Sequence, residues 1–368
     1  MLRVTYVLAG AAGADAAASA RFIAREQSVE VPEGTAPDVE ARLVGRVERL
    51  ERLEPGGAGA WRAVIAYEPE LVGGDVTQLF NLLFGNVSLL SGVRVVDVGF
   101  PDTLLARLPG PRFGIAGLRD ACGVATRPLF CTAAKPVGLG VEVLAEQCYR
   151  FARAGADIVK DDHNVADQPP ARFAERVRRC QEAVTRANVE TGGHTLYFPH
   201  VSGPIAELAA RLDLVERAGC RGVLVNLLPQ GVDAARTIGA RGLMVLAHPT
   251  MTGVFFGADH GVAPDVLLGT LFRVAGADGV IYVNAGGRFT AWTLEQCRAI
   301  NHRLRAPLGR VRAACPVPGG GVDAERVPDW VERYGTDTMF LIGASLLREP
   351  DVEAATRRVV ETLRRYEA

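Results

Sequence analysis

The sequence predicts an α/β protein in which a small α+β domain of the ferredoxin-like kind precedes a (β/α)₈ (TIM) barrel. Residues 1–112 mix strand-like and helical stretches without regular alternation. From about residue 128 the pattern becomes strand, loop and helix, and eight strand-like runs follow one another. Eight such runs are typical of a (β/α)₈ barrel, whereas a doubly wound open sheet, the alternative, usually has fewer strands. We therefore expect an N-terminal domain over 1–112 and a catalytic barrel over 113–368.

The N-terminal domain is expected to contain one antiparallel sheet. Three apolar runs predict strands: 2–10, 59–69 and 93–101. The segment 38–54 mixes apolar and charged residues, fits either a helix or a strand, and is expected to end at Pro55. The run 75–88 predicts a helix that stops at Gly85.

The first residues superficially resemble a signal peptide, because Arg3 is followed by an apolar run and small residues. Asp15 and the helical periodicity from about Ala16 favour instead a strand, a loop and a helix. We therefore expect a cytoplasmic protein. The seven cysteines never form a C-x-x-C pair, and buried free thiols are the usual state of cysteine in a reducing compartment.

Composition argues against several classes of partner. Hydrophobic residues make up 48% of the chain and charged residues 23%, and the formal net charge is −1. This balance gives no electrostatic reason to expect a nucleic acid or an anionic membrane. No run approaches the ~20 apolar residues that a membrane span needs. A small molecule is the expected partner.

The barrel strands are predicted from eight apolar runs: 128–134, 156–160, 195–201, 222–228, 242–248, 279–284, 312–317 and 338–343. Polar or glycine-rich residues stand where these runs end: Lys135, Lys160, Asp161, Asp162, His163, His200, Asn226, His248, Asn284, 318–321 and 343–345. Catalytic groups of such barrels come from the C-terminal ends of several strands. A solvated loop would explain one of these clusters, but the placement of polar groups at nearly every strand end favours a ring-shaped active site.

Several motifs, in this order, resemble those of ribulose-bisphosphate carboxylase and its RuBisCO-like relatives. They are "CTAAKPVGLG" at the first barrel strand, "GADIVKDDHNVADQP" at the second, and "CPVPGGGV" and "FLIGASLL" at the seventh and eighth. In the N-terminal part "IAREQS" and "LLFGNV" match as well. The resemblance extends over essentially the whole chain.

The resemblance implies a metal site at the second strand. Lys160 would be the lysine that CO₂ carbamylates, which turns a cation into an anionic oxygen ligand for Mg²⁺. Asp162 would be the second ligand, and His163 stands where the family has a glutamate. An imidazole suits Zn²⁺, Mn²⁺ or Fe²⁺ better than Mg²⁺. Three alternatives stay open: a metal held with His163 as a ligand, a different metal, or a metal-free site used for acid–base chemistry.

The resemblance also assigns acid–base and phosphate-binding groups. Lys135 matches the lysine that moves protons to form the enediolate, and His248 is kept as a catalytic residue. Bare backbone N–H groups in the glycine segments can bind an anion, and the phosphate-binding residues are expected to be Gly320, Gly321 and Gly343. His200, where relatives commonly have asparagine, is either an acid–base group or a packing change.

The second phosphate site of the carboxylase is missing. Pro249 replaces the phosphate-binding arginine, Ile281 replaces a histidine and Gly319 replaces a serine. Three further departures concern other parts of the machinery: Thr252 replaces a second histidine, Val137 a second lysine, and the loop after strand six offers only Arg288. Each lost charge-assisted hydrogen bond is worth ~1.5–3 kcal/mol, so we expect no CO₂ fixation and a substrate with one phosphate.

Glu26 and Asn86 match residues that complete the active site of a neighbouring subunit, which predicts a homodimer or a multiple of dimers. The resemblance implies a form IV RuBisCO-like enzyme that stabilises an enediolate. The "KDDH" motif favours a 3-oxo-isoapionate-4-phosphate decarboxylase or transcarboxylase/hydrolase. The alternatives are the 2,3-diketo-5-methylthiopentyl-1-phosphate enolase of methionine salvage and a binding protein that has lost its activity.

Overall fold

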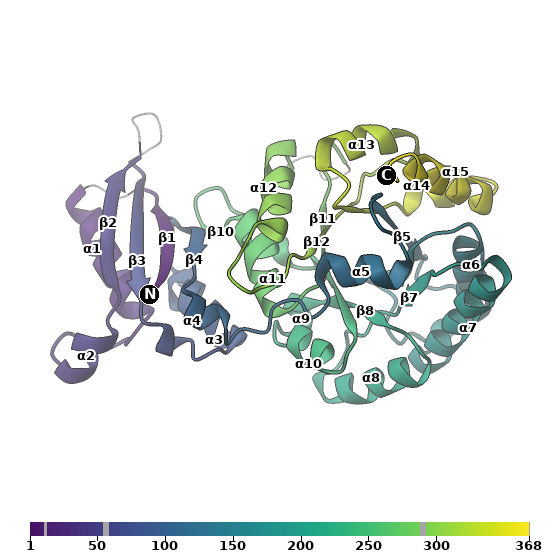
Figure 1. Cartoon of the computed structure of the whole chain (residues 1–368). Coiled ribbons are helices and arrows are strands. Elements are labelled where there is room, and N and C mark those ends of the chain that lie inside the picture. Colours follow the sequence, from purple (N-terminus) through teal and green to yellow (C-terminus); the bar gives the residue numbers. More distant parts are fainter. Residues whose placement is uncertain (11–12, 54–58, 288–291, 368) are drawn as a thin grey trace.

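The computed structural model describes residues 1–10, 13–53, 59–287 and 292–367. Figure 1 shows an N-terminal sheet domain beside a larger ring of strands and helices. The predicted fold class is confirmed in both parts, an α+β sheet domain followed by a parallel α/β barrel.

The N-terminal sheet has the order β10-β4-β1-β3-β2. Its long strands are β1 (Leu2–Leu8), β2 (Arg46–Arg52), β3 (Trp61–Tyr67) and β4 (Val93–Gly99). Alternate residues of β1 are buried, as expected for a strand with one face on a core. The helices of this domain are α1 (Gly13–Glu26), α2 (Pro37–Leu43), α3 (Val76–Phe84) and α4 (Asp102–Leu105).

The segment 38–54 contains both of the structures that its sequence allowed. α2 ends at Leu43 and β2 begins at Arg46, with Gly45 between them. A Cβ at Gly45 would lie 2.6 Å from the Tyr67 ring and 2.8 Å from the Ala24 carbonyl oxygen, so only glycine lets the chain pass there. The predicted stop at Pro55 lies outside the described residues.

The expectation of a purely antiparallel sheet from residues 1–112 is wrong at one edge. β10 (Gly261–Val262) comes from the barrel part of the chain and pairs parallel with β4, opposite Arg94 and Val95. The Ala263 N–H continues this pairing by donating to the Val95 carbonyl oxygen at 2.8 Å. A barrel loop therefore covers the edge strand of the N-terminal sheet.

All eight predicted barrel strands are present. They are β5 (Leu129–Ala134), β6 (Ile158–Asp161), β7 (Leu196–Phe198), β8 (Gly222–Asn226), β9 (Met244–His248), β11 (Gly279–Val283), β12 (Cys315–Gly319) and β13 (Met339–Leu341). Two ladders, β13-β5-β6-β7 and β12-β11-β9-β8, contain them, and a parallel bridge between His200 and Leu224 joins β7 to β8. β13 pairs with β5, so the last strand returns to the first. The seventh strand starts later than predicted, at Cys315.

Helices surround this ring (Figure 1). They are α5 (Gly114–Cys122), α6 (Val141–Arg153), α7 (Phe173–Thr191), α8 (Leu208–Arg217), α9 (Leu227–Gln230), α10 (Ala234–Ala240), α11 (Phe272–Ala275), α12 (Leu294–Arg305), α13 (Val327–Tyr334), α14 (Ala344–Leu347) and α15 (Val352–Arg364), with a π-helix, η6 (Asp265–Leu271), before α11. α5 packs against the inward side chains at the N-terminal end of the barrel, among them Leu129 and Ile158. That end is therefore filled with apolar side chains, and the opposite end is left for a site.

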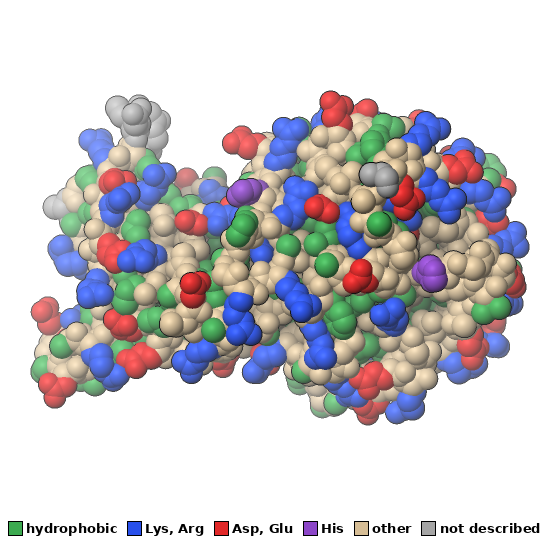
Figure 2. Space-filling view, viewed as in Figure 1, with side chains coloured by type: hydrophobic (Ala, Val, Ile, Leu, Met, Phe, Trp, Pro, Cys, Tyr) green, Lys and Arg blue, Asp and Glu red, His purple; other side chains and the backbone are tan. Residues whose placement is uncertain are grey.

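All seven cysteines are buried and free. Among the helices of the described segments, none is long and apolar enough to cross a membrane. On the face shown in Figure 2, acidic and basic side chains are interspersed over both domains. The expectation that the protein has no nucleic-acid partner stays a prediction.

Candidate functional site

A cavity of about 650 Å³ lies at the C-terminal ends of the barrel strands. It brings together all of the same-chain residues that the resemblance assigned to the site: Lys135, Lys160, Asp162, His163, His248, Gly320, Gly321 and Gly343. Glu26 and Asn86 do not line it; the Asn86 amide donates a hydrogen bond to Glu26 Oε1 at 3.0 Å in the N-terminal domain.

Strand alternation explains why these residues meet. Successive side chains of a strand point to opposite faces, so residues two apart share a face. Ile158 belongs to the apolar core inside the barrel, and Lys160 and Asp162 follow it on the same face and line the cavity. The inward positions thus pass from a closed core to an open site along a single strand.

Asp161 points to the other face of β6 and is buried behind the site. Its carboxylate accepts hydrogen bonds from Tyr197 Oη at 2.7 Å, the His200 backbone N–H at 2.9 Å and Arg176 Nε at 3.0 Å. Because these donors come from β7, the segment after it and α7, Asp161 holds the C-terminal end of β6 in place.

Lys160 is only 3% exposed. Its Nζ donates to the Asp161 carbonyl oxygen at 3.1 Å. Burial lowers the pKa of Lys160 from its usual 10.5, and the nearby Lys135 ammonium acts in the same direction. A lysine with a lowered pKa is more often a neutral amine, which is the nucleophilic form that can react with CO₂.

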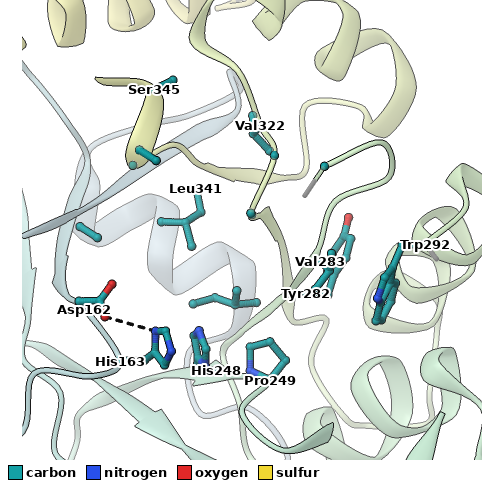
Figure 3. Close-up of a pocket in the computed structure, with 18 of the residues that line it drawn as sticks. Asp162, His163, His248, Pro249, Tyr282, Val283, Trp292, Val322, Leu341 and Ser345 are labelled. Carbon is teal, nitrogen blue, oxygen red and sulfur yellow. Dashed lines mark ion pairs between the residues drawn. The ribbon is translucent and has the colours of Figure 1, made fainter. Parts of the chain in front are cut away.

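Asp162 lies between two possible partners. Lys135 Nζ is 4.0 Å from its Oδ2 atom, and His163 Nδ1 is 3.5 Å from its Oδ1 atom (Figure 3). A Cβ at Gly343 would lie 3.3 Å from both Nζ and Cε of Lys135. Glycine at this position therefore leaves room for the Lys135 side chain to reach the cavity.

His163 and His248 form a stacked pair, with ring centroids 4.1 Å apart and an interplanar angle of 12°. Burial, followed by the charges of Lys160 and His163, lowers the pKa of His248 well below 6.5. Its Nδ1 lies 2.6 Å from Thr250 Oγ1, which donates to Asn226 Oδ1 at 3.0 Å. Since that hydroxyl hydrogen is already used, Nδ1 of His248 carries the proton and Nε2 is left as a base.

His200 is buried but is not among the residues that line the cavity. Its Nδ1 lies 3.0 Å from the Val165 carbonyl oxygen, so Nδ1 carries the hydrogen, and Nε2 has no partner among the described residues. Burial lowers the pKa of His200 to about 4. These observations favour the packing alternative over direct acid–base work on a substrate.

The glycines of the seventh strand are required by their surroundings. Gly320 has a φ of +71° and Gly321 a φ of +147°, and a Cβ at Gly321 would lie 2.2 Å from the Gly287 Cα. Asn284 Nδ2 donates to the Gly321 carbonyl oxygen at 3.4 Å, and Tyr334 Oη donates to Asn284 Oδ1 at 2.7 Å. This segment is therefore held with its backbone exposed to the cavity.

The positions of the missing second-phosphate donors also line the cavity, namely Pro249, Ile281 and Gly319. Thr252 lines it too, but its hydroxyl donates to the Pro249 carbonyl oxygen at 2.8 Å. Arg288, the basic residue expected in the loop after strand six, lies outside the described residues.

Sequence reasoning missed an apolar wall of this cavity, which we define as Pro249, Phe256, Val283 and Trp292. The rings of Phe256 and Trp292 meet edge to face, with centroids 5.5 Å apart. Figure 3 shows Trp292 and Ser345 on opposite sides of the cavity. One sequence signal was available, because Trp292 is one of only three tryptophans and follows a glycine-containing loop at a strand end.

The donor set fits a divalent cation only in part. No three His, Cys, Asp or Glu side chains within the described ranges lie close enough to hold a metal ion. Asp162 and His163 supply two donors, and a carbamate on Lys160 would supply the third. The lowered pKa of Lys160 fits that modification, so the residues present are compatible with the group.

Comparison with known proteins supports the resemblance. Residues 114–361 match the family model described as "Ribulose bisphosphate carboxylase large chain, catalytic domain". The chain is 39% identical to the "5-methylthioribulose-1-phosphate isomerase" of Rhodospirillum rubrum, over 95% of this chain and 92% of that protein. It is 32% identical to the "2,3-diketo-5-methylthiopentyl-1-phosphate enolase" of Geobacillus kaustophilus, over 78% of this chain and 70% of that protein.

Among solved structures, the RuBisCO-like protein of Rhodopseudomonas palustris superposes with a TM-score of 0.89 at 34% identity, covering 100% of this chain and 98% of that one.

Proposed function

This chain belongs to the ribulose-bisphosphate carboxylase large-chain family, among its RuBisCO-like (form IV) members, and we propose that it isomerises a methylthio-substituted ketose phosphate such as 5-methylthioribulose 1-phosphate. The relatives described above support proton transfer on methylthio sugar phosphates. They give no support to the sugar-acid decarboxylase that the "KDDH" motif favoured.

One observation carries the proposal: the two sides of the cavity differ. Gly343 lies two residues before Ser345, which Figure 3 shows across the cavity from Trp292 of the apolar wall. A substrate with a phosphate at one end and a methylthio group at the other would place each group in matching surroundings. A bisphosphate would bring its second phosphate against Pro249 and Ile281, with the desolvation cost of an unpaired charge.

The acid–base groups are suited to an isomerisation that proceeds through an enediolate. The lowered pKa of His248 keeps it neutral near pH 7, so its Nε2 can accept a proton from a carbon next to the carbonyl. Lys135, 4.0 Å from Asp162, can return a proton or stabilise the oxyanion. A divalent cation held by Asp162, His163 and carbamylated Lys160 would add stabilisation of negative charge on the substrate oxygens.

The test is a comparison of four substrates with the purified protein. We expect deuterium exchange and isomerisation of 5-methylthioribulose 1-phosphate in D₂O, followed by ¹H NMR. We expect no CO₂ release from 3-oxo-isoapionate 4-phosphate and no carboxylation of ribulose bisphosphate. Enolisation of 2,3-diketo-5-methylthiopentyl 1-phosphate without isomerisation would replace this proposal with the enolase alternative.

The apolar wall gives a sharper test of the substrate. Trp292→Ala should raise KM for the methylthio substrate about tenfold, because burial of a small apolar group is worth ~1–3 kcal/mol. KM for ribulose 1-phosphate, which lacks the methylthio group, should change little. Phe22→Ala, at a half-exposed position on α1, is the control. An equal rise in KM for both ketose phosphates would show that the wall does not recognise the methylthio group.

We also infer that two chains form a homodimer in which Glu26 and Asn86 complete the partner's cavity. In support, these two side chains are hydrogen-bonded to each other and do not line their own chain's cavity. The Glu26→Gln and Lys160→Met variants should each be inactive. When the two are unfolded, mixed and refolded together, about a quarter of wild-type activity should return, since half of random dimers are mixed and each mixed dimer has one intact site of two. No recovery despite heterodimer formation would exclude shared sites.

The seven free cysteines support a cytoplasmic location.

A further inference from the structure

We propose that Arg348, together with the hydroxyl of Ser345, binds the phosphate group of the substrate. This inference rests on the proposed function in one respect, because it assumes that the cavity takes a phosphorylated molecule. It adds two side chains to a site for which the sequence suggested only glycines.

The glycine segments alone would leave the negative charge of a bound phosphate unbalanced. A phosphate monoester carries a charge of roughly −1.5 to −2 near pH 7, and backbone N–H groups offer dipoles but no full charge. The other lysines and arginines of the cavity wall within the described ranges are Lys135 and Lys160. Both belong to the acid–base cluster around Asp162, and although Lys135 lies beside Gly343, the proposed mechanism uses it for proton transfer.

Arg348 lines the cavity at the end of the eighth-strand segment. Its Nε donates to the Ala344 carbonyl oxygen at 3.3 Å, which anchors the guanidinium and leaves both Nη groups for a ligand. Among the described residues no carboxylate forms an ion pair with it, whereas Arg357 and Arg358 on the following helix pair with Glu353 at 2.8 Å and Glu349 at 3.1 Å. An arginine fork suits two phosphate oxygens.

Ser345 supplies an independent observation. Its Oγ is buried and has no hydrogen-bond partner among the described residues, although the residue lines the same cavity. A buried hydroxyl without a partner is costly, and a bound oxyanion would satisfy it. Ser345 follows Gly343 by two residues, so the hydroxyl and the expected phosphate-binding glycine belong to one segment (Figure 3).

A carboxylate, Asp323, lines the cavity as well. Its Oδ1 accepts a hydrogen bond from the Glu325 N–H at 3.3 Å and caps the short helix η7 (Ala324–Arg326). This bond partly offsets the negative charge. The carboxylate also makes a matching cation more necessary for a phosphate bound near Gly321.

The experiment uses inorganic phosphate as the probe and the full-length protein, followed by ³¹P NMR titration. We expect saturable binding to the wild type, at least tenfold weaker binding to Arg348→Gln, and recovery of most of the affinity in Arg348→Lys. Ser345→Ala should weaken binding by a smaller factor. Arg236→Gln is the control, because Arg236 lies on α10 and pairs with Asp233 at 2.6 Å. With 5-methylthioribulose 1-phosphate, Arg348→Gln should raise KM and leave kcat nearly unchanged.

The outcomes separate this inference from the proposed function. Phosphate binding that depends on Arg348, without turnover of the methylthio substrate, would keep the phosphate site and reject the substrate. Isomerisation with phosphate affinity equal in wild type and Arg348→Gln would keep the function and overturn the inference. Absence of saturable phosphate binding to the wild type would overturn the inference as well.

Discussion

Asp157 and Asp162 are five positions apart at the two ends of one barrel strand, and their surroundings are opposite in character. At the N-terminal end Asp157 forms a two-bond ion pair with Arg127, at 2.7 and 2.8 Å, and accepts the Phe130 N–H at 2.7 Å. At the C-terminal end Asp162 accepts one hydrogen bond, from the Asn164 N–H at 3.0 Å, and has Lys135 at 4.0 Å and His163 at 3.5 Å. The first carboxylate is fully engaged by its own chain, whereas the second is open to a ligand.

A second buried carboxylate repeats the pattern at the N-terminal end. Asp278 accepts hydrogen bonds from the N–H groups of Phe113 and Gly114 at 2.7 Å and of Val245 at 2.8 Å. It thus joins the start of α5 to the barrel. One end of the barrel therefore uses its charges to hold the fold, and the other keeps charges incompletely satisfied for chemistry.

The largest effect is expected at the C-terminal end of the barrel strands, where the cavity lies. Lys160→Met should reduce activity by ~10²–10⁴-fold or more, the range for loss of an essential acid–base or ligand group. The free energy of unfolding should not fall, because the substitution removes a buried ammonium that is costly to desolvate. Activity assays and urea titrations of the same sample measure both. A large loss of stability would show that Lys160 also supports the fold.

At the N-terminal end of the barrel strands we expect the reverse: a loss of stability without a loss of activity. Arg127→Met should lower the free energy of unfolding by ~3–5 kcal/mol, because it leaves the buried Asp157 carboxylate without its cation. The kcat of the folded fraction should stay at the wild-type value. Arg178→Met, which breaks an exposed pair with Glu182, should cost less than ~1 kcal/mol. Equal effects of the two substitutions would show that the buried Arg127–Asp157 pair supports the fold no more than an exposed pair does.

A smaller effect concerns His200, which is buried near the C-terminal end of the barrel strands but outside the cavity. Its pKa is about 4 in the folded protein, against 6.5 for an unperturbed histidine, so the unfolded chain takes up a proton between these values and the folded one does not. Stability should therefore fall as the pH drops from 6.5 towards 4, by up to ~3 kcal/mol from this group. His200→Asn should flatten this part of the stability–pH curve measured by urea titration. An unchanged curve would show that other groups cause the acid sensitivity.

The barrel strands and most of the site could be predicted from the sequence, because both depend on local patterns. Apolar runs predicted eight strands, and the polar residues after them predicted a site at the C-terminal strand ends. The family motifs added the glycines of the last two strands. The seventh strand was placed too early, because Ala313 and Ala314 continue the apolar run before Cys315.

By itself, then, the sequence determined the order of the strands and which residues stand at their C-terminal ends, since each strand is marked by its own apolar run and by the polar residues that end it. Tertiary structure decided the rest. The pairing of β10 with β4, the stacking of His163 on His248, the contact of Phe256 with Trp292 and the position of Arg348 over the cavity each join segments or surfaces that no local pattern connects. Such contacts depend on how the loops fold over the completed barrel, and for that reason the chemistry was foreseeable from the strand ends but the shape of the cavity was not.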